Sequence, residues 1–156
     1  MPESEPTRVV ADADVLAADL LVGDTAREAL DHVRSHSWMT LVASDPLLDD
    51  AEAVVEALAD ADLATDWRER VEREREAVSH PEDDHPALAS AYRGRAAHLL
   101  SYDDALRSSK AGTALRPHMS VSVRSPDAFA TLFDAESLYR TIADDPYPGP
   151  DRDPRA

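Results

Sequence analysis

The chain of 156 residues has no cysteine, so disulfide bonds and thiolate metal sites are excluded. It has only four glycines, and none belongs to a glycine-rich phosphate-binding loop. No apolar run approaches the roughly 18 residues needed to cross a bilayer, and the acidic start is unlike a basic signal peptide. We therefore expect a soluble, cytoplasmic protein with one domain, because this length supports a single hydrophobic core.

Basic residues are also scarce, with 16 against 32 acidic residues and a net charge of -16. Lys110 is the only lysine, and aromatic residues make up 5% of the chain. This composition is typical of a protein from a salt-loaded cytoplasm, so we expect a halophilic origin. Negative charge ordinarily disfavours a polyanionic partner. At about 1 M salt the Debye length is only about 3 Å, so nucleic acid stays among the expected substrates.

Short apolar runs alternate with helical patterns along the chain. The runs predict strands over residues 8–11, 38–43, 98–101 and 119–123. The helical patterns cover residues 15–22, 25–36, 46–61, 63–78, 86–97 and 126–142, with a short turn from Asp104. Strands separated by helices imply parallel crossovers, so we predict an α/β fold, a three-layer αβα sandwich with a central, mainly parallel sheet over residues 8–143. The proline- and charge-rich ends, residues 1–7 and 144–156, are predicted to be flexible.

Carboxylates stand where these predicted strands end or the next helices begin. The positions are Asp12, Asp14, Asp50, Asp84 and Asp103. Taken singly, each has a structural explanation as a turn former, a helix cap or a first-turn acid. The carboxyl ends of parallel strands meet at one edge of a sheet, however, and clustered carboxylates are what a hard divalent cation needs. We therefore expect a site at this edge, where crowding raises the pKa of at least one carboxyl group.

Taken in order, the acidic motifs resemble those of the PIN domain, a family of metal-dependent nucleases. The resemblance runs from about Val9 to Phe133. Its motifs are Asp12-Ala13-Asp14-Val15-Leu16, the segment from Ser44 to Asp50, the segment from Asp83 to Ala91, the segment from Leu100 to Leu106, and Ser125-Pro126-Asp127-Ala128-Phe129. The chain departs from the family pattern at two positions, with Asp50 in place of Glu and Asp14 in place of Asn.

The resemblance implies metal-assisted hydrolysis of phosphodiester bonds, with an endoribonuclease as the expected activity and RNA as the substrate. Asp12, Asp84 and Asp103 would hold Mg²⁺ or Mn²⁺, with Asp50 as a fourth catalytic carboxylate and Asp14 adding charge near the metal. Ser101 would orient Asp103 or a metal-bound water. The basic residues that follow the third and fourth motifs are the expected RNA contacts: Arg93, Arg95, Arg107 and Lys110.

Many PIN proteins are toxins of toxin–antitoxin pairs, and many are dimers. The resemblance therefore also implies an antitoxin protein or a second copy of the chain as partners. The two departures from the family pattern leave a second interpretation open, in which the chain is a catalytically degenerate PIN-like module that binds RNA or a protein.

Three other interpretations have less support. A haloacid-dehalogenase-like phosphotransfer domain would need a threonine where Leu16 stands, and a receiver-like domain would need its lysine later than Lys110. His32 and His36 have the spacing of a helical metal pair, but no third ligand accompanies them in the sequence. Residues 67–76 alternate in charge, which is typical of a solvated helix with ion pairs.

Overall fold

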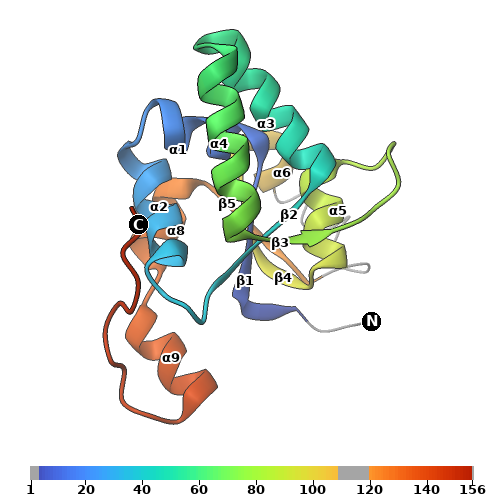
Figure 1. Ribbon diagram of the computed structural model, residues 1–156. Coiled ribbons are helices and arrows are strands. Elements are labelled where there is room, and N and C mark those ends of the chain that lie inside the picture. The colour runs from blue at the N-terminus through green and yellow to red at the C-terminus, as the bar shows by residue number, and fades with distance from the viewer. Residues whose placement is uncertain (1–3, 109–119, 156) are drawn as a thin grey trace.

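The computed structural model describes residues 4–108 and 120–155. The elements are β1 (Glu5–Ala11), α1 (Ala13–Leu21), α2 (Asp24–Arg34), β2 (Thr40–Ser44), α3 (Asp45–Leu58), α4 (Ala61–Glu74), β3 (Arg75–Val78), α5 (Pro86–Arg93), β4 (Ala96–Leu100), α6 (Asp104–Arg107), β5 (Ser122–Arg124), α8 (Pro126–Leu132) and α9 (Ala135–Ala143). The strands form one sheet in the order β3-β2-β1-β4-β5, with every neighbouring pair parallel. The predicted α/β sandwich with a parallel sheet is confirmed (Figure 1).

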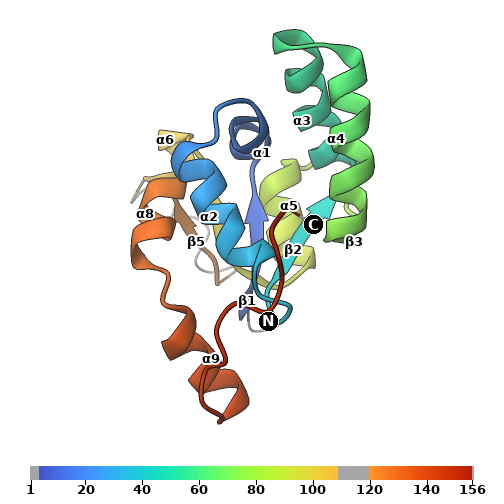
Figure 2. The ribbon, with the colours of Figure 1, turned by 60° about the vertical axis from the view of Figure 1, so that its left-hand side comes forward.

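The strand order determines which helices cover which face. The chain moves from β1 outward to β2 and β3, and then returns across the sheet to β4 and β5. Because parallel crossovers are right-handed, these two directions place their helices on opposite faces. Helices α2 and α8 accordingly pack together on one side of the sheet, and α5 contacts β1, β2 and β4 on the other (Figure 2).

The central strands are built from residues that suit burial on both faces. Val9, Val10 and Ala11 of β1 are at most 1% exposed, as are Val42 and Ala43 of β2. Such continuous apolar runs, without polar alternation, are what parallel strands covered by helices require. The predicted helix starts at Pro46, Pro86 and Pro126 are confirmed within one residue, because a proline in the first turn has no N–H to leave unpaired.

The prediction of one long helix over residues 63–78 was wrong at its end. Helix α4 stops at Glu74, and Arg75–Val78 is the edge strand β3, paired with β2 alone. The start of β3 is held by Arg75, whose guanidinium donates to the Ala43 carbonyl at 2.9 Å and to Asp45 at 2.6 Å. A charged edge strand lacks the apolar pattern by which a strand is recognised in sequence. The solvated-helix interpretation holds only in part, because Arg68 pairs with Glu72 while Trp67 is buried.

Two further predicted helices end earlier than expected. The helix predicted over residues 126–142 is interrupted, because α8 ends at Leu132 and Asp134 caps α9 by accepting from the Ser137 N–H at 3.1 Å. The helix predicted over residues 86–97 ends at Arg93, since Gly94 and Arg95 turn the chain into β4.

The C-terminal tail, defined as residues 147–155, makes contacts that its composition did not predict. The Tyr147 hydroxyl bonds His36 Nε2 at 2.6 Å, and the Asp151 N–H donates to the Ser35 carbonyl at 3.0 Å. The Arg155 guanidinium pairs with Asp31 at 2.6 Å. At the other end, residues 5–7, expected to be flexible, are the start of β1. The tail therefore lies along α2, on the same face of the sheet (Figure 2).

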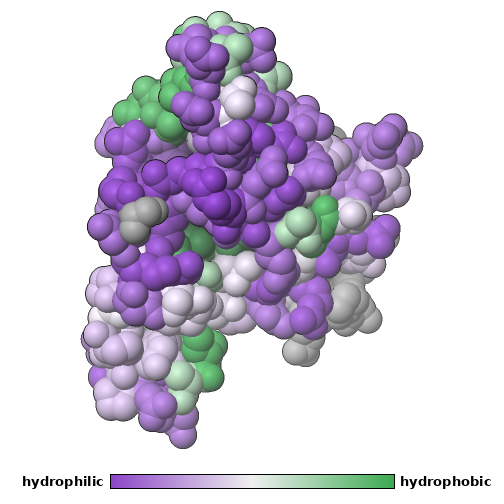
Figure 3. Space-filling view, in the orientation of Figure 1, coloured by the Kyte–Doolittle hydropathy of each residue, from purple (hydrophilic) through white to green (hydrophobic). Residues whose placement is uncertain are grey.

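Hydrophilic residues cover most of the face seen in Figure 3, as expected from the net charge of -16. Several of the acidic residues on α3 and α4 gather around one half-buried cation, Arg68, which pairs with Asp49 at 2.7 Å and Glu52 at 3.2 Å. Within the described ranges, no helix is both long and apolar enough to cross a bilayer.

Candidate functional site

The candidate site lies where β1 and β4, neighbours in the sheet, end at the same edge. Asp12 follows β1 and caps α1, with its Oδ1 accepting from the Ala13 N–H at 2.8 Å. The Asp12 N–H donates to the Leu100 carbonyl at the end of β4, at 2.8 Å. The backbone of Asp12 is therefore tied to both strands, so its carboxylate has a fixed position.

Ser101 joins Asp12 to Asp103. Its hydroxyl is buried and donates to Asp12 Oδ2 at 2.9 Å, while the same oxygen accepts from the Asp103 N–H at 3.0 Å. Asp103 Oδ1 accepts from the Ala105 N–H at 2.9 Å, which caps the short helix α6. Ser101 was predicted to orient Asp103 or a metal-bound water; its hydroxyl instead donates to Asp12, and it contacts Asp103 by accepting from the Asp103 backbone N–H.

Asp14 lies in the first turn of α1 and faces the same cluster. Its Oδ2 accepts from the Tyr102 N–H at 3.2 Å, and its Oδ1 is buried without a hydrogen-bond partner among the described residues. Burial raises the pKa of the Asp14 carboxyl, and the charges of Asp12 and Asp103 raise it further. Repulsion between crowded carboxylates therefore contributes to the raised pKa of Asp14.

Tyr102 is a residue of this site that sequence reasoning missed. Its side chain is 41% exposed beside Asp103, and its hydroxyl bonds the Thr25 side chain of α2. Burial of the hydroxyl raises the pKa of Tyr102, and Asp14, Asp127 and Asp24 add to the effect. The signal in the sequence was an aromatic residue within the fourth motif, between Ser101 and Asp103.

Asp84 and Asp50 do not join this hydrogen-bonded cluster. Asp84 precedes α5, which returns the chain from the end of β3 to the start of β4, so Asp84 lies at the same edge of the sheet as Asp12. It is exposed, and His85 rather than Asp84 caps α5. Asp50 is exposed on α3, in its second turn rather than its first. No hydrogen bond among the described residues links either carboxylate to Asp12 or Asp103.

The predicted RNA contacts divide between the two edges of the sheet. Arg95 pairs at 2.6 Å with Glu5, at the start of β1, and Arg93 ends α5 on that side. Seven residues of β1, about 20 Å of strand, separate Glu5 from Asp12. Arg93 and Arg95 therefore lie at the wrong edge for this site, because the α5 crossover carries the chain away from it. Arg107 stays close, pairing with Asp104, and Lys110 lies outside the described residues.

His32 and His36 do not form a metal pair. His36 Nδ1–H donates to the His32 carbonyl at 2.7 Å, so its Nε2 accepts from the Tyr147 hydroxyl. The His32 ring stacks near Phe133, with ring centroids 4.8 Å apart. Both histidines belong to an aromatic cluster between α2, α8 and the C-terminal tail.

The donor set of the cluster fits Mg²⁺ or Mn²⁺ bound largely through water. Among the described residues, no three His, Asp or Glu side chains gather closely enough to hold one ion together. Magnesium usually takes one or two carboxylates and keeps several waters. Asp12 and Asp103 would supply direct ligands, and the partnerless Asp14 Oδ1 is the oxygen that a hydrated cation would satisfy.

We expect Asp14→Asn to raise the melting temperature at pH 7 by about 2 °C, a small gain because solvent screens a half-exposed carboxylate. The raised pKa of Asp14 means that the native state holds its proton more tightly than the unfolded chain does. Ionised Asp14 therefore opposes folding at pH values above its native pKa. The difference in melting temperature between Asp14→Asn and the wild type should disappear below about pH 3.8, where Asp14 is protonated in both the native and the unfolded state.

The same variant tests divalent-ion binding. Mg²⁺ or Mn²⁺ should raise the melting temperature of the wild type, because a ligand bound only by the folded state stabilises it. The gain should be smaller in Asp14→Asn and absent in the Asp12→Ala/Asp103→Ala double variant. Thermal melts at constant KCl give the measurement, and equal gains in all three proteins would mean that the ions act only by screening the acidic surface.

Comparison with curated proteins found no match to this chain, and comparison with solved structures found none either. A family model matches residues 3–155, which is nearly the whole chain, so the candidate site lies entirely within the matched region. The chain therefore belongs to DUF7384, a family of unknown function.

Proposed function

We propose that this protein is a Mg²⁺- or Mn²⁺-dependent endoribonuclease that hydrolyses phosphodiester bonds at the Asp12–Asp14–Asp103 cluster. The observation that carries the proposal is that the ends of β1 and β4 bring Asp12, Asp14 and Asp103 to one edge of the sheet: the Ser101 hydroxyl donates to Asp12 and accepts from the Asp103 N–H, and Asp14 accepts from the Tyr102 N–H. A purely structural cap would not need two further acids beside it, since their repulsion costs stability. The resemblance of the motifs to PIN domains points to the same chemistry.

Each residue of the cluster has a distinct part in this proposal. The metal ion, when bound, supplies an activated water and neutralises charge on the phosphate. Ser101 holds the Asp12 carboxylate in one orientation through its 2.9 Å hydrogen bond. Asp103 uses Oδ1 as a helix cap, and its other oxygen would be a metal ligand. Asp14, whose Oδ1 has no hydrogen-bond partner among the described residues, would accept a proton from the attacking water.

The decisive experiment is a cleavage assay on a structured RNA in molar KCl, with Mn²⁺, with EDTA, and with Mn²⁺ restored after EDTA. Molar salt is needed because the net charge of -16 repels RNA at low ionic strength. We expect cleavage that EDTA stops and that excess Mn²⁺ restores.

Two outcomes would argue against the proposal in different ways. RNA binding without cleavage would favour the degenerate binding module, the second interpretation of the sequence. Cleavage that resists EDTA would indicate a contaminating metal-independent ribonuclease, and the Asp12→Ala/Asp103→Ala double variant, purified in parallel, would then cleave equally well.

A further inference from the structure

A groove lies between α2 and α4, on the face of the sheet that carries α2. It consists of two adjoining cavities of about 180 and about 280 Å³, which share Leu30, Arg34, Leu41 and Glu74 in their walls. Its floor is apolar, with Leu30 and Leu41 joined by Val33 and Met39 on one side and by Trp67 and Val71 on the other. We call it the α2–α4 groove. Pockets with apolar floors and a few polar groups are typical of sites for small molecules.

The charge of the groove is opposite to that of the protein. Five arginines and three acidic residues line the two cavities: Arg27, Arg34, Arg70, Arg152, Arg155, Asp19, Glu74 and Asp153. Asp31, beside the lining, pairs with Arg34 and Arg155, so five arginines here face four acidic residues, in a chain with twice as many acids as bases. Arg34 is held charged inside it, since burial alone would lower its pKa but the hydrogen bonds that its guanidinium donates to Asp19 and Asp31 raise it. A local positive potential in an acidic protein favours an anionic ligand.

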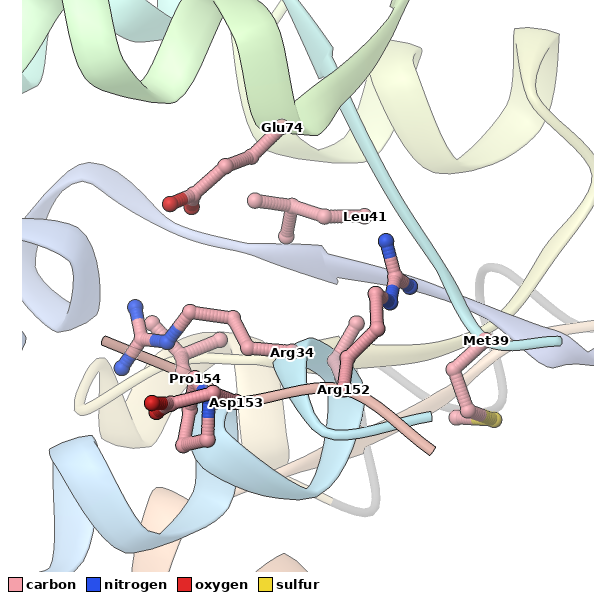
Figure 4. Close-up of a pocket in the computed structure, with 9 residues that line it drawn as sticks. Arg34, Met39, Leu41, Glu74, Arg152, Asp153 and Pro154 are labelled. Atoms are coloured by element: carbon pink, nitrogen blue, oxygen red, sulfur yellow. The ribbon is translucent and has the colours of Figure 1, made fainter. Parts of the chain in front are cut away.

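The C-terminal tail forms one wall of the groove. Arg152, Asp153 and Pro154 line the first cavity opposite Glu74, as Figure 4 shows. The Arg152 guanidinium rises from the tail toward Leu41. Among the described residues, the Arg152 guanidinium donates one hydrogen bond, from Nη2 to the His36 carbonyl at 2.8 Å. Most of its N–H donors therefore remain available to a ligand on the apolar floor.

We propose that the α2–α4 groove binds a small organic anion with an apolar body, whose anionic group contacts Arg152 of the C-terminal tail. The apolar body rests on Leu30 and Leu41, and the tail closes over the ligand. The groove opens on the face of α2 and α4, whereas the carboxylate cluster lies at the edge of the sheet where β1 and β4 end. This inference is therefore independent of the proposed nuclease activity.

The test uses two fluorescent probes that differ in charge, anilinonaphthalene sulfonate and its uncharged parent anilinonaphthalene, titrated into the full-length protein at one fixed salt concentration. We expect saturable binding of one sulfonate per chain, about tenfold tighter than the uncharged parent, because a charge-assisted hydrogen bond contributes about that factor. Arg152→Ala should remove this preference while keeping the affinity for the uncharged probe. Arg140→Ala, an exposed arginine on α9 paired with Glu136, is the matched control and should keep the preference.

Comparing the two probes distinguishes two effects of Arg152→Ala. Loss of the contact with the anionic group weakens binding of the sulfonate alone, whereas displacement of the C-terminal tail from the groove weakens binding of both probes. If Arg152→Ala weakened both probes equally, Arg152 would not be the contact for the anionic group, and the proposal would be overturned. Binding that never saturates, or equal affinity of the wild type for both probes, would overturn it as well.

Discussion

Replacing Asp103 by Asn is expected to reduce RNA cleavage by roughly 100-fold or more, because the change removes one charge from the proposed metal site. Folding should persist, since Asn caps a helix as well as Asp and can still accept from the Ala105 N–H. Metal affinity, measured by the rise of the melting temperature with Mn²⁺, should fall together with activity. The measurement is the initial rate of cleavage in molar KCl with Mn²⁺ on a structured RNA.

Asp104 offers the matched control for this substitution. It is the next residue in the chain, its side chain is 94% exposed, and its one ion pair within residues 4–108 and 120–155 is with Arg107 of the same short helix. An exposed pair of this kind contributes about 0 to 1 kcal/mol, so Asp104→Asn should be nearly silent in both assays. Equal cleavage rates for Asp103→Asn and the wild type would remove Asp103 from the site and leave it as a helix cap alone.

The largest expected loss of stability comes from a methyl group placed on Gly94, where α5 turns into β4. A Cβ there would lie 2.4 Å from Val42 Cγ1 and 3.0 Å from the Ser90 carbonyl oxygen. The φ of Gly94 is -89°, which any residue adopts, so the requirement is for space rather than for backbone freedom. We expect Gly94→Ala to cost about 1 to 3 kcal/mol, a fall of about 3 to 10 °C in melting temperature for a chain of this length.

A double-mutant cycle with Val42 tests this explanation. Val42→Ala removes both methyl groups near the new Cβ, so the pair should be less destabilised than the sum of the single variants. Gly149→Ala is the contrasting control, because a Cβ there has no atom of the described residues within 4 Å, apart from its chain neighbours, and its φ of +89° is what opposes the change. Its cost should stay near 1 kcal/mol. Strict additivity of Gly94→Ala and Val42→Ala in chemical denaturation would contradict a steric contact between them.

The candidate site was partly predictable from the sequence. Asp12 and Asp103 follow apolar strands, and parallel strands bring such positions to one edge, so their convergence follows from the strand pattern. The hydrogen-bond partner of Asp12 could not be predicted in this way. The 2.9 Å contact with Ser101 joins residues 89 positions apart and requires β1 and β4 to be neighbours in the sheet. The sequence also gave no reason to separate Arg95 from Arg107, whose distance from the site depends on the direction of α5.

The sequence by itself determined the alternation of strands and helices, through the apolar runs at Val9 and Val42 and the first-turn prolines. These signals are local, because they depend on residues only a few positions apart. They can therefore be recognised in a single sequence. Only the tertiary structure decided that Arg75–Val78 is a strand, that the C-terminal tail lies along α2, and that the Ser101 hydroxyl links Asp12 to Asp103. Each of these features depends on hydrogen bonds or ion pairs between segments that are distant in the sequence. Local sequence patterns cannot predict such contacts, because which segments become neighbours depends on the order of the strands in the sheet.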